Sequence, residues 1–258
     1  MRAVGVHADA VVVTSRLWQT NATAVRAGGE ALLIDSPYFP DELELLPTLL
    51  GQAGFAVDAL LATHADYDHL LARAAYPQLA LGVGQPSAER LREEPGVAQR
   101  ELRDEDAEHY VVRPRPLSLG SYQVLPVPGY VEIGPEQIEL HPASGHTADG
   151  TAFFARFCRL LVPGDYLSDV EIPMISEGGS SEEYRATLAR LGPLVEEAEV
   201  VVPGHGSPHD RDTALRLLDE DVDYLDALER GDEALKLPRG RDTKRQREIH
   251  ADNLRVRS

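Results

Sequence analysis

The chain contains a single cysteine, Cys158, in 258 residues. One thiol excludes an internal disulfide framework and is typical of a reducing compartment, so we expect a cytoplasmic location. Cys158 lies in an apolar run, Phe157-Cys158-Arg159-Leu160-Leu161, and is therefore interpreted as a structural thiol in or beside a strand. Lysine is also nearly absent, with only Lys236 and Lys244, which argues against a lysine nucleophile or Schiff base.

Long apolar runs and a basic surface are lacking as well. No apolar run approaches the roughly 20 residues of a membrane-spanning helix, and residues 1–10 do not resemble a secretory signal. We therefore expect no membrane partner. The formal net charge of −18 argues against a nucleic-acid partner, because phosphate contacts need basic surface. We expect a small-molecule substrate. The oligomeric state stays open, with a homodimer as one alternative.

Apolar segments between polar turns predict two successive groups of strands and helices. In the first group, strands are expected at 11–13, 23–26, 31–35, 57–63 and 79–83, with helices at 40–50, from about 69, and at 87–94. Residues 96–128 are less regular, with a charged surface segment at 100–108. In the second group, strands are expected at 110–113, 122–127, 137–144, 151–157, 159–162 and 199–202, with helices at 181–191 and 212–229.

Each group therefore combines several strands with helices near its end. This order predicts an α/β (α+β) fold of two similar sheet-plus-helix layers packed face to face, and not a regularly alternating parallel sheet. We expect one domain over residues 1–235. The basic residues 236–258 are expected to form a C-terminal tail or a surface helix.

The densest group of potential metal ligands is Thr63-His64-Ala65-Asp66-Tyr67-Asp68-His69. It directly follows the apolar residues 59–62, which we interpret as the end of a buried strand. Imidazole and carboxylate ligands at this position predict a transition-metal site at the mouth of a sheet. Three later segments place a ligand-type side chain directly after glycine at a strand-to-loop junction, where the backbone turns sharply. They are Gly145-His146, Gly164-Asp165 and Gly204-His205.

In this order the motifs resemble those of the metallo-β-lactamase fold superfamily, over about residues 10–230. The resemblance implies a four-layer αβ/βα sandwich, in which two mixed sheets carry helices on their outer faces. It also implies a two-metal centre at one edge between the sheets. The implied ligands are His64, Asp66 and His146 for the first metal, Asp68, His69 and His205 for the second, and Asp165 as the bridge.

Asp66 departs from the pattern, because most hydrolytic members of this superfamily carry a second histidine there. An aspartate is a harder, anionic ligand, which shifts the metal preference toward iron or manganese. We expect two divalent metal ions. Zinc is the first expectation for their identity, and iron or manganese are the alternatives because of Asp66. The other interpretation is that Asp66 points away and leaves the first site weak or empty.

Asp165 stands where the common zinc β-lactamases use cysteine, so the chain looks more like the thioesterase, lactonase and phosphodiesterase branches. The resemblance implies a metal-dependent hydrolase in which a metal-bridging hydroxide attacks a small ester, thioester or lactone. Asp68 is the expected catalytic residue, which orients the nucleophile and passes a proton to the leaving group. The alternatives are a phosphodiesterase, an iron-dependent oxidoreductase of the same fold, and a non-catalytic metal-binding protein.

Several other residues carry weaker expectations. Asp35 is expected to support the metal loop, whereas His141, His209 and Glu171 are interpreted as structural or solvated groups. The substrate pocket is expected between the loops at 37–40, 128–135 and 173–181. These loops carry few charges, which predicts a moderately apolar substrate.

Overall fold

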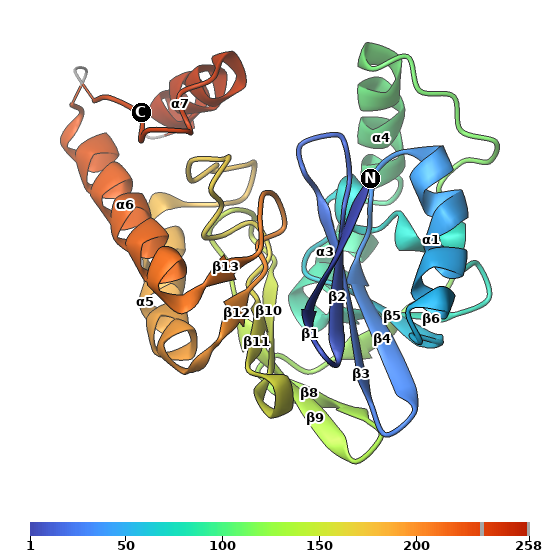
Figure 1. Ribbon diagram of the computed structural model, residues 1–258. Helices are drawn as coiled ribbons and strands as arrows, with labels where there is room; N and C mark the ends of the chain where they lie inside the picture. Colours follow the sequence, from blue (N-terminus) through green and yellow to red (C-terminus); the bar gives the residue numbers. More distant parts are fainter. Residues whose placement is uncertain (233–234, 257–258) are drawn as a thin grey trace.

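The computed structural model describes residues 1–232 and 235–256. Residues 233–234 of the predicted domain, and 257–258 of the predicted C-terminal segment, lie outside the described residues. Two sheets pack face to face in the middle of the molecule, and helices cover their outer faces (Figure 1). This arrangement confirms the predicted αβ/βα sandwich of two mixed sheets.

The first sheet has seven strands in sequential order. They are β1 (Arg2–His7), β2 (Ala10–Thr14), β3 (Asn21–Ala27), β4 (Glu30–Asp35), β5 (Val57–Ala62), β6 (Ala80–Gly84) and β7 (Gln123–Leu125). Neighbours from β1 to β4 are antiparallel, and those from β4 to β7 are parallel. Helices accompany the parallel half, because parallel strands need crossover connections. They are α1 (Pro40–Gln52), α2 (Ala72–Ala75), α3 (Gln85–Glu93) and α4 (Val97–Glu108).

The second sheet has six strands in the order β13-β12-β11-β10-β9-β8, and only the β11–β12 pair is parallel. The strands are β8 (Gly129–Ile133), β9 (Glu136–Pro142), β10 (Thr151–Ala155), β11 (Leu160–Val162), β12 (Val200–Val201) and β13 (His209–Asp210). The later helices are α5 (Ser181–Glu197), α6 (Arg211–Arg230) and α7 (Lys244–Val256). Helices α5 and α6 cover the outer face of this sheet, and α7 lies at one end of the molecule (Figure 1).

Central strands are buried on both faces, which explains their nearly continuous apolar sequences. In β4, Leu33 packs toward the helices of the first layer, whereas Leu32 and Ile34 pack between the two sheets. In β10, Phe154 faces the second helix layer and Phe153 faces the first sheet. Successive side chains of a strand point to opposite faces, so each of these strands contributes to two layers of the core.

Some local predictions were wrong. The expected strand at 110–113 is not formed: Tyr110 has φ +54° and is 94% exposed as the chain leaves α4. The charged segment before it is helix α4, in which Ala98 and Leu102 are buried four residues apart. Strands β1 and β8 were not predicted. The latter forms a hairpin with β9 across Gly134, which has φ +52°.

Cys158 lies in a 3-10 turn, η2 (Arg156–Cys158), between β10 and β11. Its side chain is buried, and burial raises the pKa of the thiol to about 11. A thiol with this pKa stays protonated at neutral pH and is a poor nucleophile. These properties agree with the structural interpretation of Cys158. Among residues 1–232 and 235–256, no helix has both the length and the apolar character needed to cross a membrane.

Candidate metal centre

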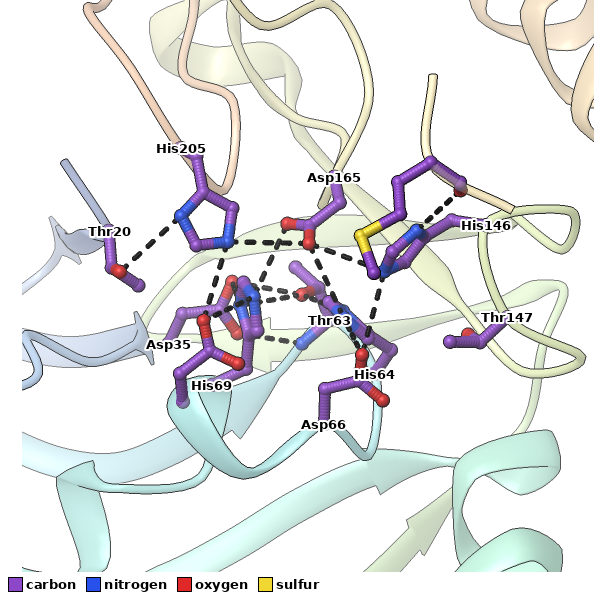
Figure 2. Close-up of polar contacts among 12 residues, drawn as sticks. Thr20, Asp35, Thr63, His64, Asp66, His69, His146, Thr147, Asp165 and His205 are labelled. Carbon is purple, nitrogen blue, oxygen red and sulfur yellow. Dashed lines mark hydrogen bonds and ion pairs between the residues drawn. The ribbon is translucent and has the colours of Figure 1, made fainter. Parts of the chain in front are cut away.

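All seven predicted ligand side chains meet at one edge of the two sheets (Figure 2). The 63–69 loop leaves the end of β5 in the first sheet, and Asp165 and His205 follow β11 and β12 in the second. His146 lies on the connection between β9 and β10. Both sheets therefore contribute, and the side chains meet only because the sheets pack face to face.

Asp165 lies between two groups of histidines. Its Oδ2 atom lies 3.7 Å from Nε2 of His64 and 3.4 Å from Nε2 of His146. The same oxygen lies 3.4 Å from Nε2 of His205, and Oδ1 lies 3.3 Å from Nε2 of His69. One carboxylate thus faces all four imidazoles, as a bridging ligand must.

The remaining carboxylates divide between the two groups. Oδ2 of Asp66 lies 3.5 Å from Nε2 of both His64 and His146. Oδ2 of Asp68 lies 3.7 Å from Nε2 of His69 and 3.4 Å from Nε2 of His205. The structure therefore does not turn Asp66 away: it places this side chain in the first group and Asp68 in the second.

Each histidine uses its Nδ1 atom for a contact outside the cluster. An Nδ1–H that donates to an oxygen leaves the lone pair of Nε2 facing the centre, which is the tautomer a metal ligand needs. The Nδ1 partners are Thr63 Oγ1 for His64 at 3.0 Å, Asp35 Oδ2 for His69 at 3.0 Å, Met174 O for His146 at 2.8 Å and Trp18 O for His205 at 3.3 Å.

The donor set fits divalent cations. Nε2 of His64, Nε2 of His69 and Oδ1 of Asp165 are buried without a hydrogen-bond partner, on side chains that are 3%, 0% and 10% exposed. Unpaired buried polar atoms are unfavourable, and three in one cluster indicate a missing common partner. Imidazole nitrogens and carboxylate oxygens are ligands for zinc, iron and manganese.

The electrostatics of the cluster agree with this assignment. Burial acts to raise the pKa of Asp165, but the charges of His69, His205 and His64 outweigh it and hold the pKa well below its usual value. Burial acts to lower the pKa of His146, yet Asp66 and Asp165 raise it to about 9. The cluster therefore strongly favours positive charge at its centre.

Asp35 lies directly behind the ligand loop, as expected. Its Oδ1 atom accepts a hydrogen bond from the backbone N–H of Thr63 at 2.8 Å, and Oδ2 accepts one from the Thr63 hydroxyl at 2.9 Å. Oδ2 also holds Nδ1 of His69. Asp35 has φ +60°, a left-handed conformation that aspartate tolerates better than most residues. Its backbone turn brings the carboxylate beneath both Thr63 and His69.

Arg90 on α3 was not anticipated from the sequence. Its guanidinium donates to Oδ1 of Asp66 at 2.7 Å and to Oδ1 of Asp149 at 2.9 Å. Asp149 in turn accepts a hydrogen bond from the backbone N–H of Ala65 at 2.8 Å. Arg90 is 24 residues from Asp66 in a charged helix, so no spacing or motif signals the contact.

The glycines before the ligands are required by close packing. A Cβ atom on Gly204 would lie 1.9 Å from Oδ1 of Asp165 and 2.9 Å from His69. Gly145 has φ +127°, and a Cβ there would lie 2.2 Å from the backbone nitrogen of Tyr184. Any side chain at either position would displace the adjoining ligand or its support.

A pocket of about 400 Å³ opens onto the cluster. The prediction that the pocket walls carry few charges was wrong, because they include Arg90, Glu94, Glu101, Glu171, Glu177 and Arg245. Of the expected segments only 173–181 contributes, through Met174, Ser176 and Glu177. Tyr38, in the expected 37–40 loop, is buried and donates a hydrogen bond to Asp106. Tyr130, in the expected 128–135 loop, is exposed on β8, and neither tyrosine lines the pocket.

Two of the secondary candidates lie apart from the pocket. His141 contacts Glu139 at 2.9 Å, and His209 on β13 lies 3.9 Å from Asp169. Neither lines the pocket described above. Glu171, which was interpreted as a solvated charge, lies instead beside Asp165 and His205: one ligand atom from each of the three lies within 4.8 Å of the others.

A sequence profile of the metallo-beta-lactamase superfamily matches residues 15–205, which include all seven ligand positions. The chain therefore belongs to this superfamily, which includes metal-dependent hydrolases. No curated protein matches the sequence.

Solved structures share the fold. The metallo-beta-lactamase family protein TTHA1429 from Thermus thermophilus is 18% identical, with a TM-score of 0.67 over 86% of this chain and 81% of its own. The DIM-1 metallo-beta-lactamase is 18% identical, with a TM-score of 0.62 over 84% and 95%. TTHA1623, solved in a di-iron-bound form, is 25% identical, with a TM-score of 0.63 over 80% of this chain and 97% of its own.

Proposed function

We propose that the protein is a dinuclear metal-dependent hydrolase acting on a small ester, thioester or lactone. The observation that carries this proposal is Asp165, whose carboxylate faces the Nε2 atoms of four histidines in two groups. His64, Asp66 and His146 would hold one metal, and Asp68, His69 and His205 the other, with Asp165 shared. Two divalent cations in such a site activate water and polarise a carbonyl oxygen.

In this proposal, the protein's own residues orient the attacking water and transfer its proton to the leaving group. Asp68 is only 8% exposed but lines the pocket, and Ser36 fixes it by donating a hydrogen bond to its backbone carbonyl at 2.7 Å. In the proposal, a carboxylate oxygen of Asp68 accepts a hydrogen bond from the attacking water, takes up its proton as the water attacks, and delivers this proton to the leaving group. The acidic pocket walls disfavour long polyanions, which supports a small substrate.

Metal analysis and a substrate panel test this proposal. Protein purified without added metal would be assayed for metal content. It would then be tested on lactones, thioesters, simple esters and phosphodiesters with Zn²⁺, Mn²⁺ and Fe²⁺. We expect two metal ions per chain, and hydrolysis that is abolished in both His205→Ala and Asp165→Asn. Full turnover in these variants, on a substrate that the wild type hydrolyses, would contradict the assignment.

An iron-dependent oxidoreductase is the second candidate. It is favoured by the position of Asp66 in the first group and by the di-iron-bound form of TTHA1623. A carboxylate-rich donor set suits iron better than an all-imidazole set. Oxygen-dependent turnover with iron, without hydrolysis of any of the panel substrates, would favour this candidate over hydrolysis.

A further inference from the structure

Glu171 is a carboxylate next to the second group of ligands. It lies on the connection between β11 and α5, and its side chain is only 11% exposed. One of its oxygens, one of Asp165 and one ring nitrogen of His205 all lie within 4.8 Å of one another. Burying a carboxylate in this position is unfavourable without a compensating positive charge.

The backbone of Glu171 is fixed to the strand end that carries His205. The Ser168 hydroxyl donates to the carbonyl oxygen of His205 at 2.8 Å and accepts a hydrogen bond from the N–H of Glu171 at 3.0 Å. Arg241 donates to the carbonyl oxygen of Glu171 at 3.0 Å. The next N–H, of Ile172, donates to the side chain of Gln246 at 2.8 Å. The position of Glu171 is therefore determined by the site on one side and by the C-terminal segment on the other.

Arg245 on α7 forms an ion pair with the side chain of Glu171. The closest contact between its guanidinium and the Glu171 carboxylate is 3.7 Å. The same guanidinium lies over the Trp18 ring, 4.0 Å from its centroid, and this ring packs edge-on against His205 at 6.4 Å. The Trp18 ring thus holds Arg245 beside His205. From this position the guanidinium attracts the Glu171 carboxylate toward the pocket.

A single guanidinium does not balance the charge at this point. Asp68, Asp165 and Glu171 bring three carboxylates around two imidazoles. Oδ1 of Asp165 and Nε2 of His69 lie 3.3 Å apart, and both are buried without a hydrogen-bond partner. Carboxylates converge on buried points of this kind where they coordinate a cation. The two atoms without a hydrogen-bond partner are a separate observation from the position of Glu171, and both face the second group of ligands.

We propose that Glu171 is a further ligand of the second metal position, beside Asp68, His69, Asp165 and His205, and that Arg245 is its positioning residue. The inference rests on the proposed dinuclear site. A fifth side chain at this position exceeds the four ligands typical of structural zinc, and a third carboxylate adds a hard oxygen donor. The second position therefore prefers manganese or iron(II) over zinc more strongly than it would without Glu171.

Metal titration of the full chain tests this proposal. Metal-free wild type and Glu171→Gln would be titrated with Mn²⁺ and Zn²⁺ by calorimetry, with bound metal counted after desalting. We expect Glu171→Gln to bind the first ion normally and the second about 10-fold or more weakly, with a greater loss for Mn²⁺ than for Zn²⁺. The visible spectrum of the Co²⁺ form, which reports coordination number, should change for the second ion only.

Three more variants make the result specific. Glu177→Gln changes an exposed glutamate of the same pocket and should bind both ions as the wild type does. Glu171→Asp keeps the charge but withdraws the carboxylate, so it should also weaken the second ion. Arg245→Gln should produce a smaller loss in the same direction.

Unchanged affinity for the second ion and an unchanged Co²⁺ spectrum in folded Glu171→Gln, or in Glu171→Asp if the former does not fold, would overturn the role of Glu171. That result would leave the dinuclear site intact. A wild-type chain that binds fewer than two ions contradicts the dinuclear site itself, and with it this assignment.

Discussion

The guanidinium of Arg90 holds Oδ1 of Asp66 at 2.7 Å, while Oδ2 of the same carboxylate lies 3.5 Å from Nε2 of His64 and of His146. The two oxygens of Asp66 therefore have different partners. One pairs with an arginine, and the other faces the two histidines of the first group. In the proposed site, the pairing with Arg90 would make Asp66 a weaker electron donor, so Arg90 would offset part of the loss of Lewis acidity that an aspartate ligand causes.

Replacing Arg90 should weaken the first metal position. In Arg90→Gln, Asp66 loses the partner that orients it, and we expect the affinity for one of the two ions to fall by about 10- to 100-fold. Titration of metal-free protein with Zn²⁺ measures the change. Arg92→Gln removes an exposed charge from the same helix and serves as the control. Two ions bound with wild-type affinities in Arg90→Gln would show that Asp66 needs no such support.

Asp35→Asn tests the charge behind the second metal position. Asparagine tolerates the φ of +60° at this position, and its amide oxygen can still accept the hydrogen bond from the N–H of Thr63. Its NH2 group then replaces the carboxylate oxygen that faces the Thr63 hydroxyl and Nδ1 of His69, so both the charge and the acceptor for His69 are removed. We expect activity or second-ion affinity to fall by about 10- to 100-fold, because Nδ1 of His69 loses its acceptor. Asp58→Asn, at an exposed position of β5, is the matched control. If both variants behave alike, the carboxylate of Asp35 does not tune His69.

Gly204→Ala should disrupt the centre without changing any ligand. The added Cβ would lie 1.9 Å from Oδ1 of Asp165, so this carboxylate must move. Displacement of reacting groups by about 1 Å costs on the order of 100-fold in rate, and we expect at least this loss in kcat/KM. Gly192→Ala is the control, because its nearest neighbour would be Leu218 at 3.9 Å. There alanine should raise helix stability by about 0.5–1 kcal/mol in urea unfolding.

Arg241 is a buried cation that ties the segment before α7 to α6. Both Arg241 and Asp221 are only 1% exposed; they form an ion pair, and Arg241 also donates to Glu220 at 2.9 Å. Arg241→Leu leaves Asp221 buried without its partner, which should lower the free energy of unfolding by about 3–5 kcal/mol. Urea denaturation measures this loss.

The double variant Arg241→Leu with Asp221→Leu separates charge from packing. Removing both charges should recover most of the stability, because well-packed apolar groups often replace a buried ion pair without loss. If the double variant is as unstable as Arg241→Leu alone, packing and not the uncompensated charge explains the effect.

Local sequence was sufficient to identify the candidate ligands. The candidate ligands between His64 and His69 lie close together in the sequence, and each later candidate ligand directly follows a glycine. These features depend only on residues that are close in the sequence, so they can be identified without knowledge of the packing. The two sheet-and-helix layers were predictable for a similar reason, because apolar periodicity is a local property.

Contacts between distant residues were not predictable in this way. Nothing in a charged helix marks Arg90 as the partner of Asp66, and Glu171 has the sequence context of a solvated loop charge. The pocket walls were misassigned because they combine α3, α4 and α7, whose positions depend on how the layers pack.

By itself, the sequence determined the superfamily, the two-layer order of strands and helices, and the seven side chains able to bind metal. Only the tertiary structure decided that Asp66 faces the histidines of the first group and that Glu171 lies beside Asp165 and His205. The reason is physical: a side chain's identity is a local property, but its charge environment depends on which distant groups are buried next to it. In this protein those groups are Arg90, for Asp66, and Arg245, for Glu171.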